Sequence, residues 1–371
     1  MWLLVRRAMF QTPYYRLTLE GFLFLLVTLF IGFAAFNTDI NLLYLILSLM
    51  CAFMIVSGFL STISLRPIRV ERQLPHHLVA GEVGHVRLQV HNPKRLFSSY
   101  SLKITDHLDG GAAAGRAFVL AVPPRAKVRV SYPCLLERRG VYYFRHVRIS
   151  SRFPFGFFER SAYLNLPEHL LVYPQSIDLS HRVKIAPELV GERESARKGQ
   201  GSSLYGLRAY TTSDSARAIH WKVSARADEL MVREFESEHR RRFILILNNH
   251  PSGPDSPALR ERFEKAVILC ASLARLLIGR GFQVQLITAS GRVPPDSGRA
   301  HLDRILRALA IVELAPGQTP AVLPRGGAAP DGSEATCCRI EYEPRGAGHE
   351  PAACMTLGVD DVDWSGIHVA A

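Results

Sequence analysis

The sequence predicts a multidomain protein with three parts: an N-terminal transmembrane helical hairpin, an all-β sandwich of immunoglobulin or fibronectin type, and a C-terminal α/β domain. Three observations predict this class. Two long apolar runs without charge stand near the N-terminus, the hydropathy then alternates with a period of two, and strand and helix patterns take turns in the last part. The 371 residues are enough for two or three domains.

The composition narrows the range of partners. The formal net charge is +12, and such a basic surface suits nucleic acid, an anionic membrane face or an acidic protein. The six cysteines are too few and too scattered for a disulfide scaffold, so reduced thiols are expected in a cytosolic setting. The chain has no glycine-rich phosphate loop, and we expect no cofactor.

Residues 1–65 are predicted to form two transmembrane helices, over about 19–36 and 42–60. Each uncharged run approaches the roughly 20 residues that cross a bilayer. Arginines precede the first run and follow the second, and the short polar connection carries only Asp39. The positive-inside rule then predicts a multi-pass protein with both termini in the cytoplasm. A cleaved signal peptide fits less well, because a second apolar run follows the first. A buried helical hairpin of a soluble protein is the other alternative, and we favour the transmembrane hairpin.

Residues 66–175 show the pattern of short antiparallel strands. Val86, Leu88 and Val90 alternate with polar residues, and the same alternation returns between turn signals further on. This spacing predicts a β-sandwich. The aromatic run 153–158 has two interpretations, a platform for stacked bases or a hydrophobic plug where one domain docks on the next. We favour the plug.

Residues 176–203 are predicted to be a polar linker, and residues 204–371 to hold an α/β domain. Phe243 to Leu247 is an apolar run typical of a buried parallel strand. A helical pattern from Leu259 to Leu277, a strand from Phe282 to Leu286 and a helix from Leu302 to Val312 follow. This alternation predicts a doubly wound sheet.

The stretch Leu204–Glu238 is the densest run of aromatic and charged residues. Ser213 or Asp214 can cap a helix that continues through His220, and the residues from Leu230 alternate as a strand. The stretch resembles the signature of a bacterial family known as domain of unknown function 58. The matching residues are Gly206, Arg208, Tyr210, Asp214, Arg217, Ile219, Trp221, Lys222, Ser224, Ala225, Arg226, Val232, Arg233 and Glu234. Ser213 departs from the pattern, because the family usually has glycine there.

This resemblance implies several expectations. A second group of residues supports it, namely Arg138, Arg139, Gly140 and Tyr142, then 154–157 and 172–174. It implies a von Willebrand type A-like domain in the C-terminal part and a place in the bacterial cytoplasmic (inner) membrane. It also implies a MoxR-type AAA+ ATPase as partner, with a transglutaminase-like membrane protein as a further candidate.

Two chemical alternatives stand beside a pure interaction protein. Asp214, His220 and Ser224 are close enough for a hydrolase triad, although no nucleophile elbow or oxyanion-hole motif accompanies them. A metal-dependent, adhesion-type von Willebrand type A site would lie after the strand at Leu247. There Asn248, His250 and Ser252 form a degenerate motif that has lost its carboxylate, so we expect no metal.

We therefore expect a membrane-anchored, cytoplasm-facing interaction or assembly factor that is not an enzyme. The lipid bilayer is one partner, and nucleic acid is not expected, because the basic residues form no recognition helix or RNA-binding sheet. The expected interaction residues belong to the signature stretch, and they are Gly206, Arg208, Tyr210, Asp214, Arg217, His220, Trp221, Lys222, Ser224, Arg226, Arg233 and Glu234. They act either as a brace between domains or as a docking surface.

Overall fold

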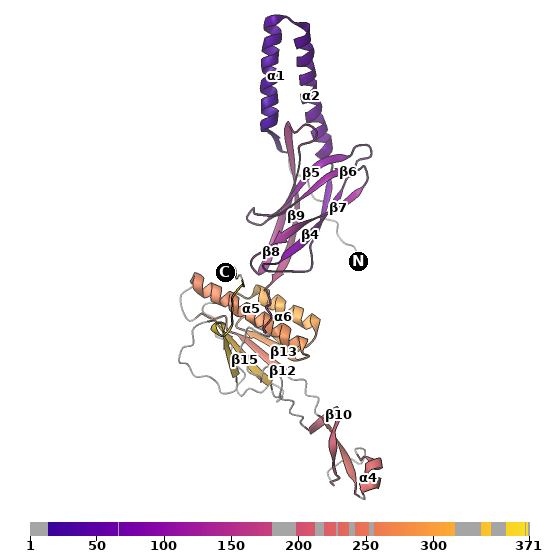
Figure 1. Cartoon of the computed structure of the whole chain (residues 1–371), viewed down its shortest axis with the longest axis vertical. Coiled ribbons are helices and arrows are strands. Elements are labelled where there is room, and N and C mark those ends of the chain that lie inside the picture. Colours follow the sequence, from indigo (N-terminus) through magenta and orange to yellow (C-terminus); the bar gives the residue numbers. More distant parts are fainter. Residues whose placement is uncertain are drawn as a thin grey trace. The chain divides into compact units, whose positions relative to one another are not determined.

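The computed structural model describes residues 14–65, 67–179, 198–211, 219–227, 229–236, 242–251, 256–315, 335–342, 354–367 and 369. The chain divides into two compact units, Met1–Pro174 and Gln175–Ala371. Figure 1 shows both units, with the helical hairpin and the strands β1 to β9 in the first.

The predicted hairpin consists of α1 (Leu19–Thr38) and α2 (Asn41–Leu65), both long and apolar enough to cross a membrane. Thr18 caps α1, because its hydroxyl accepts the Gly21 N–H at 3.0 Å. Asp39 ends α1 in the left-handed conformation, which turns the chain tightly into α2. α2 continues five residues past the predicted end, and its C-terminal part from Ser57 onward buries Ser57, Ser61 and Ser64 in the unit.

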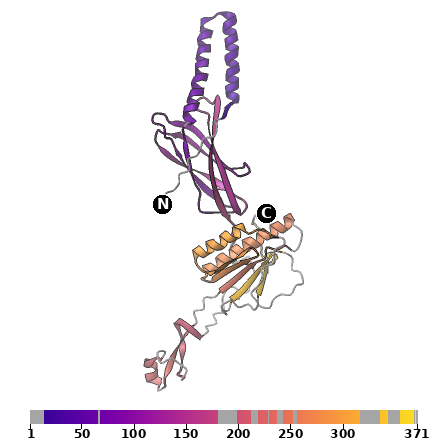
Figure 2. The ribbon, with the colours of Figure 1, turned by 180° about the vertical axis from the view of Figure 1, so that it is seen from behind.

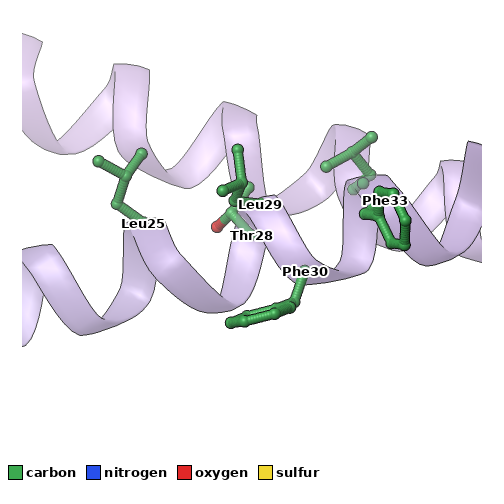
Figure 3. A pocket seen from close by; sticks show the side chains of 7 residues that line it. Leu25, Thr28, Leu29, Phe30 and Phe33 are labelled. Atoms are coloured by element: carbon green, nitrogen blue, oxygen red, sulfur yellow. The ribbon is translucent and has the colours of Figure 1, made fainter.

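An apolar groove lies between the two helices (Figure 3). It is lined by Leu25, Thr28, Leu29, Phe30, Gly32, Phe33 and Leu47. The Thr28 hydroxyl donates to the Phe24 carbonyl at 2.7 Å, so it is satisfied within its own helix. No charged side chain lines this groove, which agrees with the interpretation of the hairpin as an anchor.

Two sheets form the predicted sandwich. The larger has the order β1 (Tyr14–Leu17), β9 (Phe158–Tyr173), β8 (Gly140–Ser151), β5 (Ser99–Leu108) and β6 (Ala113–Val122), with β3 (Leu78–Val79) also on β9. The smaller has the order β2 (Arg69–Gln73), β4 (Val83–His91) and β7 (Lys127–Leu135). The alternating residues Val86, Leu88 and Val90 lie in the shared core, as predicted. β1 was not predicted, because its four residues are exposed and carry no alternation.

A charged cluster lies inside the sandwich core. The side chains of Arg72 and Asp106 are both fully buried, and two hydrogen bonds of 2.7 and 2.5 Å join them. The Tyr132 hydroxyl donates to Asp106 Oδ2 at 2.7 Å, and Arg72 also donates to the Leu166 carbonyl. The Arg72 guanidinium stands over the Phe144 ring, 4.9 Å from its centroid. Every charge is therefore paired in a region of low dielectric.

The aromatic run 153–158 connects β8 to β9 and contacts both helices of the hairpin. The Phe157 ring stacks on Phe24 of α1 at 4.4 Å, and the Phe155 ring meets Phe53 of α2 edge-on at 5.2 Å. The Thr18 hydroxyl donates to the Gly156 carbonyl at 2.6 Å. The plug interpretation is confirmed: this loop docks the hairpin on the sandwich.

The second unit contains a five-stranded sheet of order β14 (Gly291–Asp296), β13 (Gln283–Thr288), β12 (Arg242–Leu247), β15 (Ala335–Glu341) and β16 (Cys354–Gly358). All pairs are parallel except that of β13 and β14. The helices are α5 (Pro257–Gly279) and α6 (Arg299–Ile311), and the short 3₁₀ helix η2 covers Val359–Asp361. The strands and helices predicted in this region are confirmed. β14 was not predicted, because it contains two prolines.

The doubly wound arrangement is wrong for the described residues. α5 and α6 share one core with Leu245, Val284 and Ile340, so both helices cover the same face of the sheet (Figure 2). On the other face Ile244 and Ile246 form only a small separate cluster with Cys337. The hairpin of β13 and β14 reverses the chain before α6, which removes the right-handed crossover that the prediction assumed.

The linker predicted over 176–203 also needs correction at both ends. The Ile177 N–H donates to the Ser272 hydroxyl of α5 at 2.8 Å, and Leu179 is buried in the same core. At the other end, the strand β10 (Lys198–Ala209) begins six residues before the predicted boundary. Residues 180–197 lie outside the described part of the chain.

Candidate functional site

The signature residues form a small lobe made of β10, α4 (Trp221–Ala227) and β11 (Met231–Glu236). β10 and β11 pair antiparallel, so Gly206 lies opposite Glu234 and Arg208 lies opposite Val232. The two ends of the motif are therefore neighbours in space, although 28 residues separate Gly206 from Glu234 in the sequence. This pairing explains why the signature combines a Gly-x-Arg strand with a Val-Arg-Glu strand.

The helix of the lobe begins later than predicted. Ile219 bridges to Val232 as a strand residue, and the His220 N–H donates to the Met231 carbonyl at 2.8 Å. Both residues are thus held in extended backbone, and the first helical residue is Trp221. Asp214 and Arg217 lie outside the described residues, so the cap proposed at Asp214 is not visible. The strand predicted from Leu230 is confirmed as β11.

α4 presents one exposed surface, here called the α4 surface and defined by Trp221, Lys222 and Arg226. Trp221 is 66% exposed, and both basic side chains are exposed as well. Successive helical residues turn by about 100°, so these three share an arc of about 140°, and Ser224 lies about 60° outside that arc, on the side where α4 meets β11. Ser224 is buried with Ile219 and Val232, which form the small core of the lobe. A large aromatic ring is thus displayed beside two cations.

The buried hydroxyl of Ser224 serves the backbone. It accepts the Met231 N–H at 2.8 Å and lies 3.2 Å from the His220 carbonyl oxygen, to which it donates. The hydroxyl therefore ties α4 to β11 and does not meet the imidazole of His220, as a triad requires. His220 is half-buried, and its Nδ1 has no hydrogen-bond partner among the described residues. The geometry gives Ser224 a structural role.

Other signature residues are placed only in part. Tyr210 is half-buried, and its N–H donates to the Leu230 carbonyl at 2.7 Å. Arg208, Arg233 and Glu234 are located by their backbone in the β10–β11 pair.

The loop after β12 is organised by a residue that the sequence did not single out. Asn249 is fully buried, and its amide donates to the Ser290 hydroxyl and the Glu313 carbonyl and accepts the Ala289 N–H. Asn248 accepts the His250 N–H, which closes a local turn. Ser252 lies outside the described residues, and within them no three His, Cys, Asp or Glu side chains come together. Asn248 and Asn249 hold the loop through amide groups and backbone atoms.

The cysteines differ from the expectation at one position. Cys134, Cys270 and Cys338 are buried free thiols, and burial raises the pKa of Cys134 to about 11 and that of Cys338 to about 12. Cys337, in contrast, is disulfide-bonded, and the β15–β16 register sets its Cα opposite that of Cys354. The prediction of reduced thiols throughout is therefore wrong for Cys337. The twin Cys337-Cys338 point to opposite faces of β15, as neighbours in a strand must.

Two relatives of this chain are uncharacterized proteins. The uncharacterized protein YeaD of Bacillus subtilis is 27% identical over 271 residues, which are 70% of this chain and 66% of YeaD. The uncharacterized protein Rv1480 of Mycobacterium tuberculosis is 27% identical over 146 residues, 38% of this chain and 46% of that protein. The matches thus span just under two thirds of the first relative and about half of the second.

Similarity to solved structures is weak. A CARDB domain from Pyrococcus furiosus, solved with di-metal ions, covers 28% of this chain and 91% of its own, at 12% identity and a TM-score of 0.21. A superoxide reductase (neelaredoxin) variant from Ignicoccus hospitalis covers 28% and 78%, at 17% identity and a TM-score of 0.18.

The region that contains the signature lobe is the one that a family model recognises. The matched residues are 206–338, which run from the second half of β10 through the α/β sheet to β15. Through this region the chain is related to the family described as Protein of unknown function DUF58.

Proposed function

We propose that this protein is a membrane-anchored interaction or assembly factor that performs no reaction itself. The observation that carries the proposal is the α4 surface: Trp221 stands 66% exposed beside Lys222 and Arg226 on a lobe with its own small core. Tryptophan and arginine are the side chains most often found at the centre of protein interfaces. An acidic, apolar-lined groove on another protein would complement this surface. Docking, rather than bracing, is thus the role we assign to it.

The partner that we propose is a MoxR-type AAA+ ATPase, with a transglutaminase-like membrane protein as a further candidate. Both rest on the family resemblance of the signature. The chemistry of the α4 surface agrees with an acidic protein partner and does not require nucleic acid. The absence of catalysis is supported by Ser224, whose hydroxyl is bonded to backbone atoms of His220 and Met231.

The finer description of the two folded parts is also a proposal. When β1 and the two-residue β3 are left out, the sandwich has seven strands. β2, β4 and β7 form one sheet, and β5, β6, β8 and β9 form the sheet that faces it. This order supports a fibronectin-type sandwich. A mostly parallel sheet with its first strand, β12, in the centre supports a von Willebrand type A-like domain. The helices on one face are the departure from that type.

Replacing Trp221 with alanine is expected to weaken partner retention by about 30-fold or more, since a central tryptophan contributes about 2 kcal/mol or more to an interface. The variant should be present in membranes at the wild-type level, because the ring is exposed. The measurement is crosslinking in membranes followed by a pull-down that quantifies the AAA+ ATPase. Ser224→Ala is the matched control from the buried face of the same helix.

The two variants separate docking from bracing. Ser224→Ala removes a hydrogen bond inside the lobe, so it should lower stability while leaving the α4 surface intact. Loss of folded protein in Trp221→Ala would show that the ring is a structural brace. Full retention of the ATPase by a folded Trp221→Ala variant would refute the docking role.

For the membrane arrangement, we propose a bacterial inner-membrane protein with both units on the cytoplasmic side. The two apolar helices and the arginines that flank them support it. The disulfide at Cys337 is the observation against this orientation, because disulfides persist mainly in oxidising compartments.

The orientation can be measured at the exposed residue Lys222. A Lys222→Cys variant is expected to resist a membrane-impermeant maleimide in intact cells and to react once the membrane is permeabilised. Labelling in intact cells would place α4 outside the cytoplasm, and the disulfide would then have its ordinary explanation. A second variant, Lys265→Cys on α5, repeats the measurement on the α/β sheet, since Lys265 is partly exposed.

A further inference from the structure

The loop that joins β4 to β5 exposes two large apolar side chains. Leu96 is 83% exposed and Phe97 is 52% exposed, and Arg95 beside them is exposed as well. Leu120 of β6, 73% exposed, and Arg125 of the next turn belong to the same end of the sandwich. We propose that these five residues, here called the membrane-face patch, enter the headgroup region of an anionic bilayer next to the helical anchor.

The position of the loop is fixed by hydrogen bonds to the end of α2. Lys94 Nζ donates to the carbonyl oxygens of Ile63 and Ser64 at 2.6 and 3.1 Å, and also to the Ser99 hydroxyl. A cation at the C-terminus of a helix meets its unpaired carbonyl groups and the negative end of its dipole. Burial lowers the pKa of Lys94 to about 8, so the cation persists at neutral pH. The loop is therefore clamped to the last turn of the anchor.

The remaining members of the patch are tied to the same point. The Asn92 side chain donates to the Phe97 carbonyl at 3.0 Å and to the Val122 carbonyl at 2.9 Å. The Arg125 N–H donates to the Lys94 carbonyl at 3.1 Å. The end of β6 and the turn after it thus lie against the loop, which brings Leu120 and Arg125 to the side of Phe97.

The length of α2 sets the depth of the patch. A bilayer core of about 30 Å needs roughly 20 helical residues, and α2 has 25. About five residues, or roughly 7 Å of helix, therefore extend past the hydrocarbon, which is close to the thickness of one headgroup layer. Ile63 and Ser64, which bind Lys94, lie in this last part. The patch consequently stands at headgroup level.

The chemistry of the patch suits a lipid surface rather than water. Apolar side chains at the boundary of headgroups and acyl chains leave water, while neighbouring cations remain beside lipid phosphates. Arg95 and Arg125 supply that charge, and each basic residue near an anionic leaflet adds attraction. The occupant we assign is the anionic phospholipid around the anchor. The assignment rests on the proposed membrane anchoring, since the helices bring the patch to the bilayer.

The experiment uses the full chain with a benzophenone side chain at a single position, reconstituted in vesicles of phosphatidylcholine and phosphatidylglycerol. Position 96 is expected to give about tenfold more lipid adduct than position 83, because apolar side chains at this depth contact lipid. Val83 is the matched control: it is apolar, 60% exposed and at the other end of β4. The nine residues of β4 separate its two ends by about 27 Å.

A third position, Leu45 in α2, separates this proposal from the anchoring on which it rests. Leu45 is 65% exposed and lies inside the apolar run, one turn after the start of α2. Adducts at 45 without adducts at 96 would overturn the membrane-face patch and leave the anchor standing. No adduct at 45 would refute the anchor itself. Adducts of position 96 with a second protein, in native membranes, would also overturn the proposal. Arg95→Glu with Arg125→Glu should lower the yield at 96 several-fold in the anionic vesicles.

Discussion

Asp106→Ala is expected to destabilise the β-sandwich by about 3–5 kcal/mol, because it leaves the buried Arg72 without its counter-ion. Asp106 is fully buried and accepts two hydrogen bonds from Arg72 and one from Tyr132. Removal of the carboxylate strands a guanidinium in the core and leaves the Tyr132 hydroxyl without an acceptor. A loss of this size is comparable to the whole stability of many domains.

The unfolding of this part of the chain can be followed at Cys134. That thiol is buried in the sandwich core, and burial together with Asp106 raises its pKa to about 11, so it should react with maleimide only after the sandwich opens. Pulse labelling across a urea series, read at the peptide that contains Cys134, therefore measures the sandwich separately from the free thiols at Cys51, Cys270 and Cys338, which matters in a chain with several folding units.

Two controls accompany the Asp106 variant. Asp109→Ala removes an exposed ion pair of the same unit, with Arg145, and should cost less than about 1 kcal/mol. The double change Arg72→Met with Asp106→Leu removes both charges and should restore most of the loss. A single Asp106→Ala variant as stable as Asp109→Ala would contradict the role assigned to the cluster.

Gly21→Ala is expected to disrupt the docking of the hairpin on the sandwich at a cost of about 3 kcal/mol, the upper range for overpacking. A Cβ at Gly21 would overlap the backbone carbonyl of Phe157. Backbone atoms cannot rotate away, so α1 must shift and lose the contacts of Thr18 and Phe24 with the aromatic loop. The change runs against ordinary helix propensity, which favours alanine over glycine by up to about 1 kcal/mol.

The effect can be read at Arg16, which β1 pairs with Glu159 of β9. Trypsin should cleave after Arg16 more than tenfold faster in Gly21→Ala, because each 1.4 kcal/mol changes the open fraction tenfold. Gly32→Ala is the matched control in the same helix, where the nearest atom to the new Cβ would be Leu47 Cδ1 at 3.5 Å. Equal cleavage rates in the two variants would show that the close approach at Gly21 is unimportant.

The sequence predicted those elements whose signal lies within one segment. The two helices follow from uncharged runs of membrane length, and β4, β5, β7 and β8 follow from alternation with a period of two. The predicted start of the helix in the signature was wrong, because Ile219 pairs with Val232 and the His220 N–H donates to the Met231 carbonyl across the lobe. The helix propensity of the residues after Asp214 gave no sign that pairing with β11 would compete with helix formation. The exposed strand β1 was missed for the same reason, since it is held by its pairing with β9.

In the candidate site, too, the sequence predicted local features and missed those that depend on distant contacts. The signature residues were identified as a group, but the exposure of Trp221 and the burial of Ser224 could not be predicted, because they depend on how α4 packs against β11. Asn249 had no signal of its own. Its importance arises from three partners that lie 40 or more residues away.

An apolar hairpin, a β-rich part and an α/β part could be predicted from the amino-acid sequence, because hydropathy and its period are local properties. The contact of the aromatic loop with both helices of the hairpin and the pairing of Arg72 with Asp106 inside a core became visible in the folded chain. The same holds for the packing of α5 and α6 on one face of the sheet. These features depend on contacts between residues far apart in the chain, whose free energy exists only once the backbone has brought them together.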